Sequence, residues 1–249
     1  MTFGLWDGAL LLLVSLQATA LAYVRHAKWK ALLLSLPVPF TLGALAVGLP
    51  VNTTHVAALN LLLGYTHAVR LLHDGFRLPI LPSIVLSASG YCGAGVLLRP
   101  VLPQSSLAFW LTCLVTLLVA LAARALSAHF PEEGERRHLP PWIKFPIVAS
   151  VILSLIVMKK FLQEFMALFP MVGVVASYES RRNLGLLCRA MPDFLLAMVP
   201  MMAAVRLVQP RLGLGAALAL GWLIFLPSLW PMFHDFRAAP EVPQGTETP

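Results

Sequence analysis

The sequence has little charge. Only 12% of its 249 residues are Asp, Glu, Lys or Arg, whereas 59% are hydrophobic. A soluble domain carries about 25% charged residues. The apolar excess comes in blocks of roughly 18 or more residues, which as helices can cross a hydrocarbon core about 30 Å thick. Short alternating segments, which a membrane barrel requires, are almost missing. The composition therefore predicts an all-α polytopic membrane protein with the lipid bilayer as its surroundings.

Acidic residues and cysteines are also few. There are 11 Asp and Glu against 18 Lys and Arg, a formal net charge of +7. The basic residues stand singly or in pairs between apolar blocks, without the basic stripe or aromatic platform typical of nucleic-acid binding. We therefore expect no nucleic-acid partner. The three cysteines form no CxxC pair, which argues against a disulfide framework and favours buried thiols that act as small hydrophobes.

Motifs for catalysis and for metal binding are missing as well. The chain has no Walker loop, no GxSxG and no GxGxxG, and its seven histidines are scattered without an HxxxH pair. These spacings bring the reacting or ligating groups of hydrolases, nucleotide-binding proteins and zinc enzymes together. We therefore expect no enzyme activity, no cofactor and no metal.

Nine apolar blocks are candidate membrane spans. They cover residues 5–24, 31–49, 54–72, 80–98, 107–127, 142–160, 163–180, 191–208 and 212–230. The first block resembles a signal peptide, but its positive charges follow it, so a retained span is expected. If residues 54–72 cross the membrane, most Lys and Arg fall on one face; otherwise they divide nearly evenly. Because the cytoplasmic face is the basic one, we predict nine spans in a bacterial inner membrane, with the N-terminus periplasmic and the C-terminus cytoplasmic.

The two halves of the chain share a pattern. Trp29-Lys30 aligns with Trp142…Lys144, and LPSIVLS (81–87) aligns with MPDFLLA (191–197). The pattern predicts a bundle of one leading helix and two parallel four-helix repeats, as in transporters that form sites between repeats. The expected parts are a leading helix 1–28, a first repeat 29–128, a cytoplasmic linker 129–141, a second repeat 142–232 and a disordered tail 233–249.

A family resemblance lies in the second half. Phe169-Pro170, then Tyr178, then Arg181 or Arg182, then Leu187 and Arg189 follow one another between residues 142 and 230. This order resembles the GlpM-like small inner-membrane proteins of bacteria. The resemblance implies four-span units in the cell envelope without a settled biochemical activity, one of which has been linked with alginate production.

A polar stripe marks the third block. Asn60, Gly64, His67 and Leu71 share one helical face, and Arg70 follows near the cytoplasmic end. Polar groups on a spanning helix face protein or a wet cavity, so Asn60, His67 and Arg70 are candidates for a substrate path. His67 is a candidate for a proton-coupled step because histidine titrates near neutral pH. The alternative is that Asn60 and His67 form hydrogen bonds between helices.

A charged cluster follows the seventh block. Tyr178, Glu179 and Arg182 are candidates for a substrate path, and an ion pair between Glu179 and Arg182 is expected from their spacing. The Arg181–Arg182 pair also marks a cytoplasmic loop. Asp193 is expected to cap the start of the next span. Arg99 and Arg206 occupy matching outer ends, where they snorkel to the interface or attract an anion.

Prolines identify candidate helix breaks. Pro37 and Pro39 lie in SLPVPF, and Pro170 lies in LFPMVG. A proline removes a helical hydrogen bond, and the freed groups need protein or water as partners in lipid. These breaks are consistent with a cavity, or with ordinary kinks.

Two functions follow from these observations. The first is permease-like movement of a small solute or a lipid-linked molecule between the halves. The second is a non-catalytic accessory or scaffold role in envelope or exopolysaccharide assembly, with a homodimer or an envelope protein as partner.

Overall fold

The computed structural model describes residues 4–23, 35–127, 142, 145–146, 149–151, 153, 162–181 and 184–229. Every secondary-structure element within these ranges is helical, and they contain no strand. The all-α class is therefore confirmed. The elements are α1 (Leu5–Tyr23), α3 (Val38–Val47), α4 (Thr53–Arg70), the π-helix η1 (Leu71–Gly75), α5 (Ile80–Leu98), α6 (Ser106–Ser127), the 3-10 helix η2 (Gln163–Leu168), α8 (Met171–Glu179) and α9 (Leu184–Ser228).

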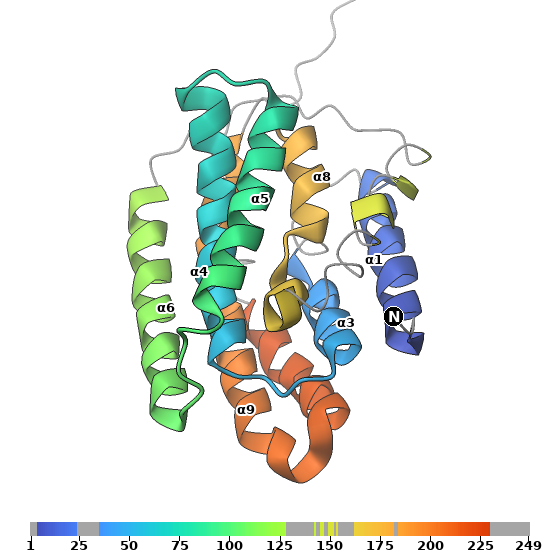
Figure 1. The fold of residues 1–249 in the computed structure, drawn as a ribbon, viewed down its shortest axis with the longest axis vertical. Helices are drawn as coiled ribbons and strands as arrows, with labels where there is room; N and C mark the ends of the chain where they lie inside the picture. The colour runs from blue at the N-terminus through green and yellow to red at the C-terminus, as the bar shows by residue number, and fades with distance from the viewer. Residues whose placement is uncertain are drawn as a thin grey trace, which may run out of the picture.

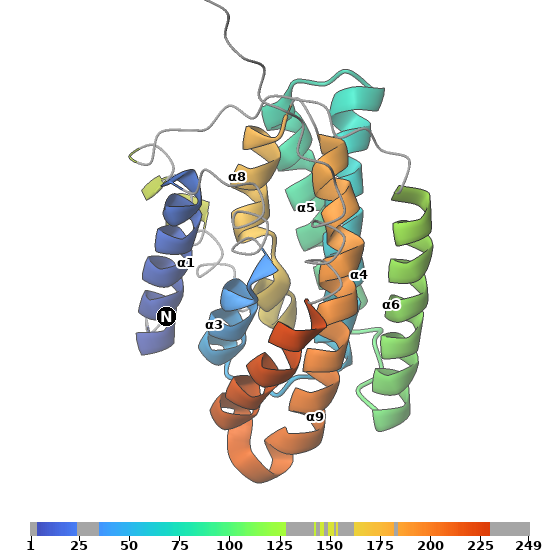
Figure 2. The same cartoon turned by 180° about the vertical axis from the view of Figure 1, so that it is seen from behind.

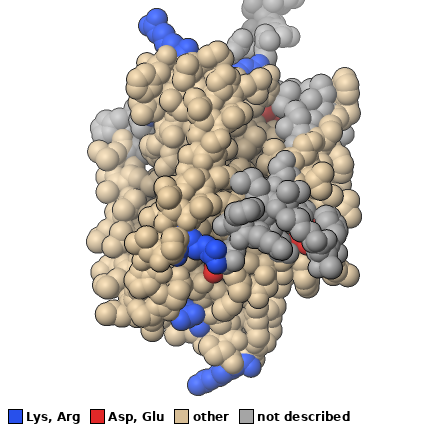
Figure 3. All heavy atoms as spheres, viewed as in Figure 1, with Lys and Arg blue, Asp and Glu red and all other residues tan. Residues whose placement is uncertain are grey.

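Three of the described helices are long and apolar enough to cross a membrane: α5, α6 and the greater part of α9. Their outer faces expose large apolar side chains, among them Leu97, Leu107 and Leu223. Figure 3 shows one face of the molecule, where charged side chains are few and most of the described surface is uncharged. Apolar patches of this extent are rare on soluble proteins. The protein is therefore a helical protein of the membrane-spanning type.

Four predicted spans closely match described helices. The block 80–98 has the bounds of α5, and α1 and α6 differ from their blocks by one residue at an end. The block 54–72 corresponds to α4, which continues directly into η1. Helix α4 is not among the three apolar ones, because Asn60, His67 and Arg70 lower its hydropathy. The block 142–160, the linker 129–141 and the tail 233–249 lie wholly or largely outside the described residues.

Two of the predicted spans are interrupted. Pro37 is the N-cap of α3 and Pro39 lies in its first turn, so the described helix in the block 31–49 has only 10 residues. The block 163–180 is not one helix. It contains η2, then a break at Phe169 and Pro170, then the nine residues of α8. Because proline has no N–H and fixes its φ, it favours the start of a helix over its interior.

The last two blocks form one bent element, α9. It begins at Leu184, earlier than the predicted start at residue 191, and its two limbs meet at Gly213, where φ is 75° and ψ is 167°. The expectation that Asp193 caps a helix start is therefore wrong, because it lies inside the first limb. There Asp193 Oδ1 is 3.4 Å from Arg124 Nη1 of α6.

Helix α4 is the centre of the arrangement. It packs against α5, α6, α9 and η2, and its buried apolar side chains, such as Leu59 and Val69, belong to the core. Figures 1 and 2 show α6 and α1 at opposite sides of the molecule, with α8 between α5 and α1. Helix α3 packs against η2 on one side and α1 on the other. The interrupted segments therefore lie together, next to the central helix.

The Gly213 bend should be intolerant of a side chain. Its φ and ψ fall in a region that is essentially restricted to glycine, so we expect Gly213→Ala to lower the stability by about 1–3 kcal/mol. Gly215→Ala is the matched control, since Gly215 is helical and a Cβ there has no atom within 4 Å. Thermal unfolding in detergent measures both. Equal midpoints for the two variants would contradict this account of the bend.

Candidate functional site

Two residues of the predicted polar stripe of α4, Asn60 and His67, have hydrogen-bond partners in different helices. Asn60 Nδ2 donates a hydrogen bond to Thr116 Oγ1 of α6 at 2.7 Å. His67 Nδ1 lies 3.0 Å from the carbonyl oxygen of Leu63, one turn earlier in α4. Asn60 therefore forms a hydrogen bond between two helices, which is the alternative to a role in a substrate path. His67 forms its hydrogen bond within its own helix.

The other predicted path residues lie at the end of the bundle where α4 and α8 terminate. Arg70 Nε is 3.7 Å from Asp74 Oδ2, and both side chains are partly exposed. The Arg181 guanidinium lies 4.7 Å from the centroid of the Tyr178 ring. Glu179 is buried in the last turn of α8. Arg182 lies outside the described residues, so its predicted ion pair with Glu179 stays a prediction.

The two interrupted segments pack against each other closely. Gly43 of α3 faces Ala167 of η2 so tightly that a Cβ at Gly43 would lie 2.7 Å from the Cα of Ala167. The breaks at Pro37 and Pro170 thus accompany direct backbone contact between a short helix and a 3-10 helix. Tyr91 of α5 holds η2 from another side, because its hydroxyl donates to the carbonyl oxygen of Phe165 at 2.9 Å.

A polar cluster surrounds the start of α4. Asn52 is the N-cap, and its Oδ1 accepts from the backbone N–H groups of Thr54 and His55. Such a cap satisfies donors that a helix start otherwise leaves free. The His55 ring is fully buried, and its Nδ1 lies 3.3 Å from Asn52 N and 3.0 Å from Asn52 Oδ1. Whichever tautomer His55 adopts, its Nε2 has no hydrogen-bond partner among the described residues.

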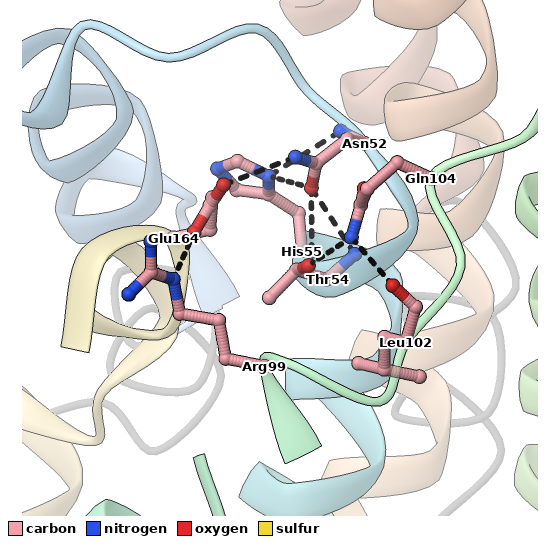
Figure 4. Close-up of polar contacts among 7 residues, drawn as sticks. All are labelled: Asn52, Thr54, His55, Arg99, Leu102, Gln104 and Glu164. Atoms are coloured by element: carbon pink, nitrogen blue, oxygen red, sulfur yellow. Dashed lines mark hydrogen bonds and ion pairs between the residues drawn. The ribbon is translucent and has the colours of Figure 1, made fainter. Parts of the chain in front are cut away.

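Glu164 of η2 completes this cluster. Its Oε1 accepts from Asn52 Nδ2 at 3.1 Å, whereas Oε2 has no hydrogen-bond partner within the described ranges. Among the described residues, Arg99 forms an ion pair with this carboxylate, with Nε 4.0 Å from Oε2. Figure 4 shows Asn52 in contact with both His55 and Glu164, and Arg99 reaching the carboxylate from the end of α5. We call Asn52, His55, Arg99 and Glu164 the Glu164 cluster.

Backbone contacts hold the loop before α4 in place. Gln209 of α9 accepts from the N–H of Val51 and donates to its carbonyl oxygen, both at 2.9 Å. Arg206 Nη1 donates to the same carbonyl oxygen at 3.3 Å. Gln104 Nε2 donates to Thr54 Oγ1 at 2.9 Å. Arg99 and Arg206, expected to snorkel or to attract an anion, therefore contact protein groups of this region.

More buried polar atoms continue from the Glu164 cluster toward the other end of α4. Tyr65 of α4 and Ser177 of α8 are both buried, and their side chains interact with each other. The Tyr65 ring lies against α8, since a Cβ at Gly173 would be 3.7 Å from Tyr65 Cε1. We call the surface marked by His55, Glu164, Tyr65 and Ser177 the seam.

Two polar atoms of the seam, His55 Nε2 and Glu164 Oε2, are buried without a hydrogen-bond partner among the described residues. A buried polar atom without a partner costs about 1–3 kcal/mol, and most such atoms in folded proteins find one. Within the described part of the chain, no group of three or more His, Cys, Asp or Glu could hold a metal ion. The three cysteines are free and at least partly buried, as expected of small hydrophobes.

Comparison of the chain with protein-family models, curated proteins and solved structures finds no match. The resemblance to the GlpM-like proteins therefore stays a prediction.

Sequence reasoning missed the Glu164 cluster. It selected Glu179 and Asp193 as acidic groups near apolar sequence and passed over Glu164 in FLQEFMALF, although the chain has only 11 acidic residues. It did not select Asn52 as a candidate site residue. One signal was available: an acid inside an apolar stretch is a functional candidate by default. Its pairing with Asn52, 112 residues away, had no sequence signal.

Proposed function

We propose that the protein is a permease-like membrane protein that moves a small solute or a lipid-linked molecule along the seam. The observation that carries the proposal is the set of buried polar side chains on α4, η2 and α8, beside two interrupted helices. Two of their atoms, His55 Nε2 and Glu164 Oε2, have no hydrogen-bond partner among the described residues. Irregular backbone at membrane depth is tolerated where it lines a cavity or is buried in protein. Transporters use such breaks to present polar groups to their substrates.

The proposal includes the placement derived from the sequence. It assumes nine spans in two parallel repeats, a bacterial inner membrane, a periplasmic N-terminus and a cytoplasmic C-terminus. In this orientation the Glu164 cluster faces the periplasm and the cluster around Arg70 and Tyr178 faces the cytoplasm. A solute would therefore enter by one polar cluster and leave by the other. The charge bias of the loops supports this orientation.

Flux through reconstituted protein tests the proposal. Vesicles of phosphatidylethanolamine and phosphatidylglycerol would be assayed by osmotic swelling in glycerol, glycine and potassium phosphate, and by flip of a fluorescent phospholipid. We expect the wild type to pass at least one probe faster than empty vesicles. Gly173→Leu should remove that flux, because its side chain would crowd the contact between α8 and Tyr65, where a Cβ at Gly173 already lies 3.0 Å from Pro170 Cβ.

Gly93→Leu is the matched control. Gly93 is exposed on α5, and a Cβ there has no atom within 4 Å, so the same substitution should leave flux unchanged. Both variants should elute from gel filtration as the wild type does. If wild-type vesicles pass no probe faster than empty ones, the permease proposal is overturned, and the accessory role in envelope assembly replaces it.

A further inference from the structure

The connection between α4 and α5 is a short loop at one end of the bundle. Helix α4 passes into η1, and residues 76–79 then lead into α5. Figure 1 shows this connection at the opposite end of the molecule from the loop between α5 and α6. Helix α5 has 19 residues, which at about 1.5 Å each match a hydrocarbon core about 30 Å thick. The residues just before α5 therefore lie at the level of the lipid headgroups.

Hydrogen bonds fix the shape of this loop. The N–H of Phe76 donates to the carbonyl oxygen of Leu71 at 3.0 Å, and the N–H of Leu78 donates to that of Leu72 at 3.0 Å. His73 Nδ1 lies 2.7 Å from the carbonyl oxygen of Leu78. Since a carbonyl oxygen only accepts, the imidazole is the donor in this bond. The backbone is therefore held on both sides of the residue between Phe76 and Leu78.

That residue, Arg77, has a strained backbone conformation. Its φ is 56°, and within the described part of the chain it is the one residue other than glycine with a positive φ. The left-handed region is unfavourable for residues with a Cβ, and glycine or asparagine is its usual occupant. Conformations of this kind cluster at functional sites, where the surrounding structure imposes them. An arginine at this position therefore points to a role for its side chain.

The loop combines an exposed cation with exposed apolar side chains. Arg77 is exposed and forms no ion pair among the described residues, whereas Asp74 beside it pairs with Arg70. Phe76 is 67% exposed, and Leu81 in the first turn of α5 is 60% exposed. Figure 3 shows basic side chains that project from this end of the molecule. At a membrane surface, apolar side chains enter the acyl boundary while neighbouring cations stay among the headgroups.

We propose that Phe76 and Arg77 bind an anionic phospholipid, with the Phe76 ring against its acyl chains and the Arg77 guanidinium at its phosphate. A guanidinium presents a planar set of N–H donors that fits phosphate oxygens. Because Arg77 has no acidic partner among the described residues, a headgroup with net negative charge complements it better than a zwitterionic one. The exposed ring beside the cation favours a lipid over a free phosphate ion. This site does not depend on the passage of a solute along the seam.

Native mass spectrometry of the full chain in detergent tests the site. It would measure the dissociation constants of the first bound phosphatidylglycerol and of phosphatidylcholine with the same acyl chains. The wild type should bind phosphatidylglycerol more tightly. Arg77→Asn should weaken phosphatidylglycerol binding about fivefold, the factor that one basic residue near a membrane surface contributes, and leave phosphatidylcholine binding unchanged. Phe76→Ala should weaken both lipids, because contact with acyl chains does not distinguish the headgroups.

Arg211→Asn is the matched control. Arg211 is also exposed, but it lies at the other end of the bundle, two residues after Gln209, which bonds Val51 just before α4. Its removal should leave the preference for phosphatidylglycerol in place. Arg77→Asn should unfold at no lower temperature than the wild type, because asparagine tolerates the left-handed region better than arginine does. A loss of affinity in that variant is then not an effect of folding.

The outcomes separate the two proposals. A preference for phosphatidylglycerol that is lost in Arg77→Asn and kept in Arg211→Asn supports the lipid site, even if reconstituted vesicles pass no solute. The lipid site is overturned if the wild type binds both lipids equally, if Arg77→Asn keeps the preference, or if both arginine variants lose it alike. Each of these results would stand even if solute flux is found.

Discussion

Gly43→Ala is expected to lower the stability by about 1–3 kcal/mol, the usual range for overpacking a tight core. The new Cβ would lie 2.7 Å from the Cα of Ala167 and 3.3 Å from its Cβ. The first contact is with backbone, so no side-chain rotation relieves it. Either α3 or η2 must move. Because η2 carries Glu164, the shift would also displace the carboxylate from Asn52 and Arg99.

Thermal unfolding in detergent measures this effect, and Gly90→Ala is its control. Gly90 is helical and exposed on α5, and a Cβ there meets nothing within 4 Å. Alanine in a helix is favoured over glycine by roughly 0.5–1 kcal/mol, so Gly90→Ala should be neutral or slightly stabilising. A Gly43→Ala variant as stable as Gly90→Ala would show that α3 and η2 do not pack this closely.

Membrane-helix bounds could be predicted where a block is uniformly apolar and ends at polar residues. The block 80–98 begins after Pro79 and ends before Arg99, and α5 has the same bounds. Here the length of apolar sequence alone carries the information, since a span needs about 20 such residues. The same reasoning located α1 and α6 to within a residue at each end.

Other bounds could not be predicted because they depend on backbone geometry and on neighbours. The first limb of α9 starts at Leu184, in a stretch whose arginines suggested a loop. Proline does mark the interruptions before α3 and α8, but the pattern does not reveal that η2 becomes a 3-10 helix. That conformation accompanies the close approach of Ala167 to Gly43, which involves residues far apart in the chain.

The candidate site was likewise predictable only where it depends on local sequence. Local spacing suggested a polar face on α4, yet Asn60 of that face contacts α6 and not η2. The Glu164 cluster combines the start of α4, the end of α5 and η2, none of which has a recognisable motif. Only packing brings Asn52 to Glu164. Burial of the carboxylate, which gives the site its chemistry, is likewise a property of the assembled bundle.

Gln209→Leu is expected to lower the stability by about 1–3 kcal/mol, the cost of leaving a buried polar group without a partner. Leucine has a similar volume but cannot bond the backbone of Val51, which is fully buried. The Val51 carbonyl oxygen would keep its bond from Arg206. The Val51 N–H would lose Gln209 Oε1, to which it donates at 2.9 Å.

Gln104→Leu is the control for this prediction. Gln104 is exposed, although it bonds Thr54 Oγ1 and the carbonyl oxygen of Leu102, and water can replace both contacts. Its loss should therefore cost less than about 1 kcal/mol. The midpoints of thermal unfolding measure the stability of both variants. Equal midpoints would refute the anchoring role of Gln209. Because Val51 precedes the N-cap Asn52, a loosened Val51 should also shift the amide that holds Glu164.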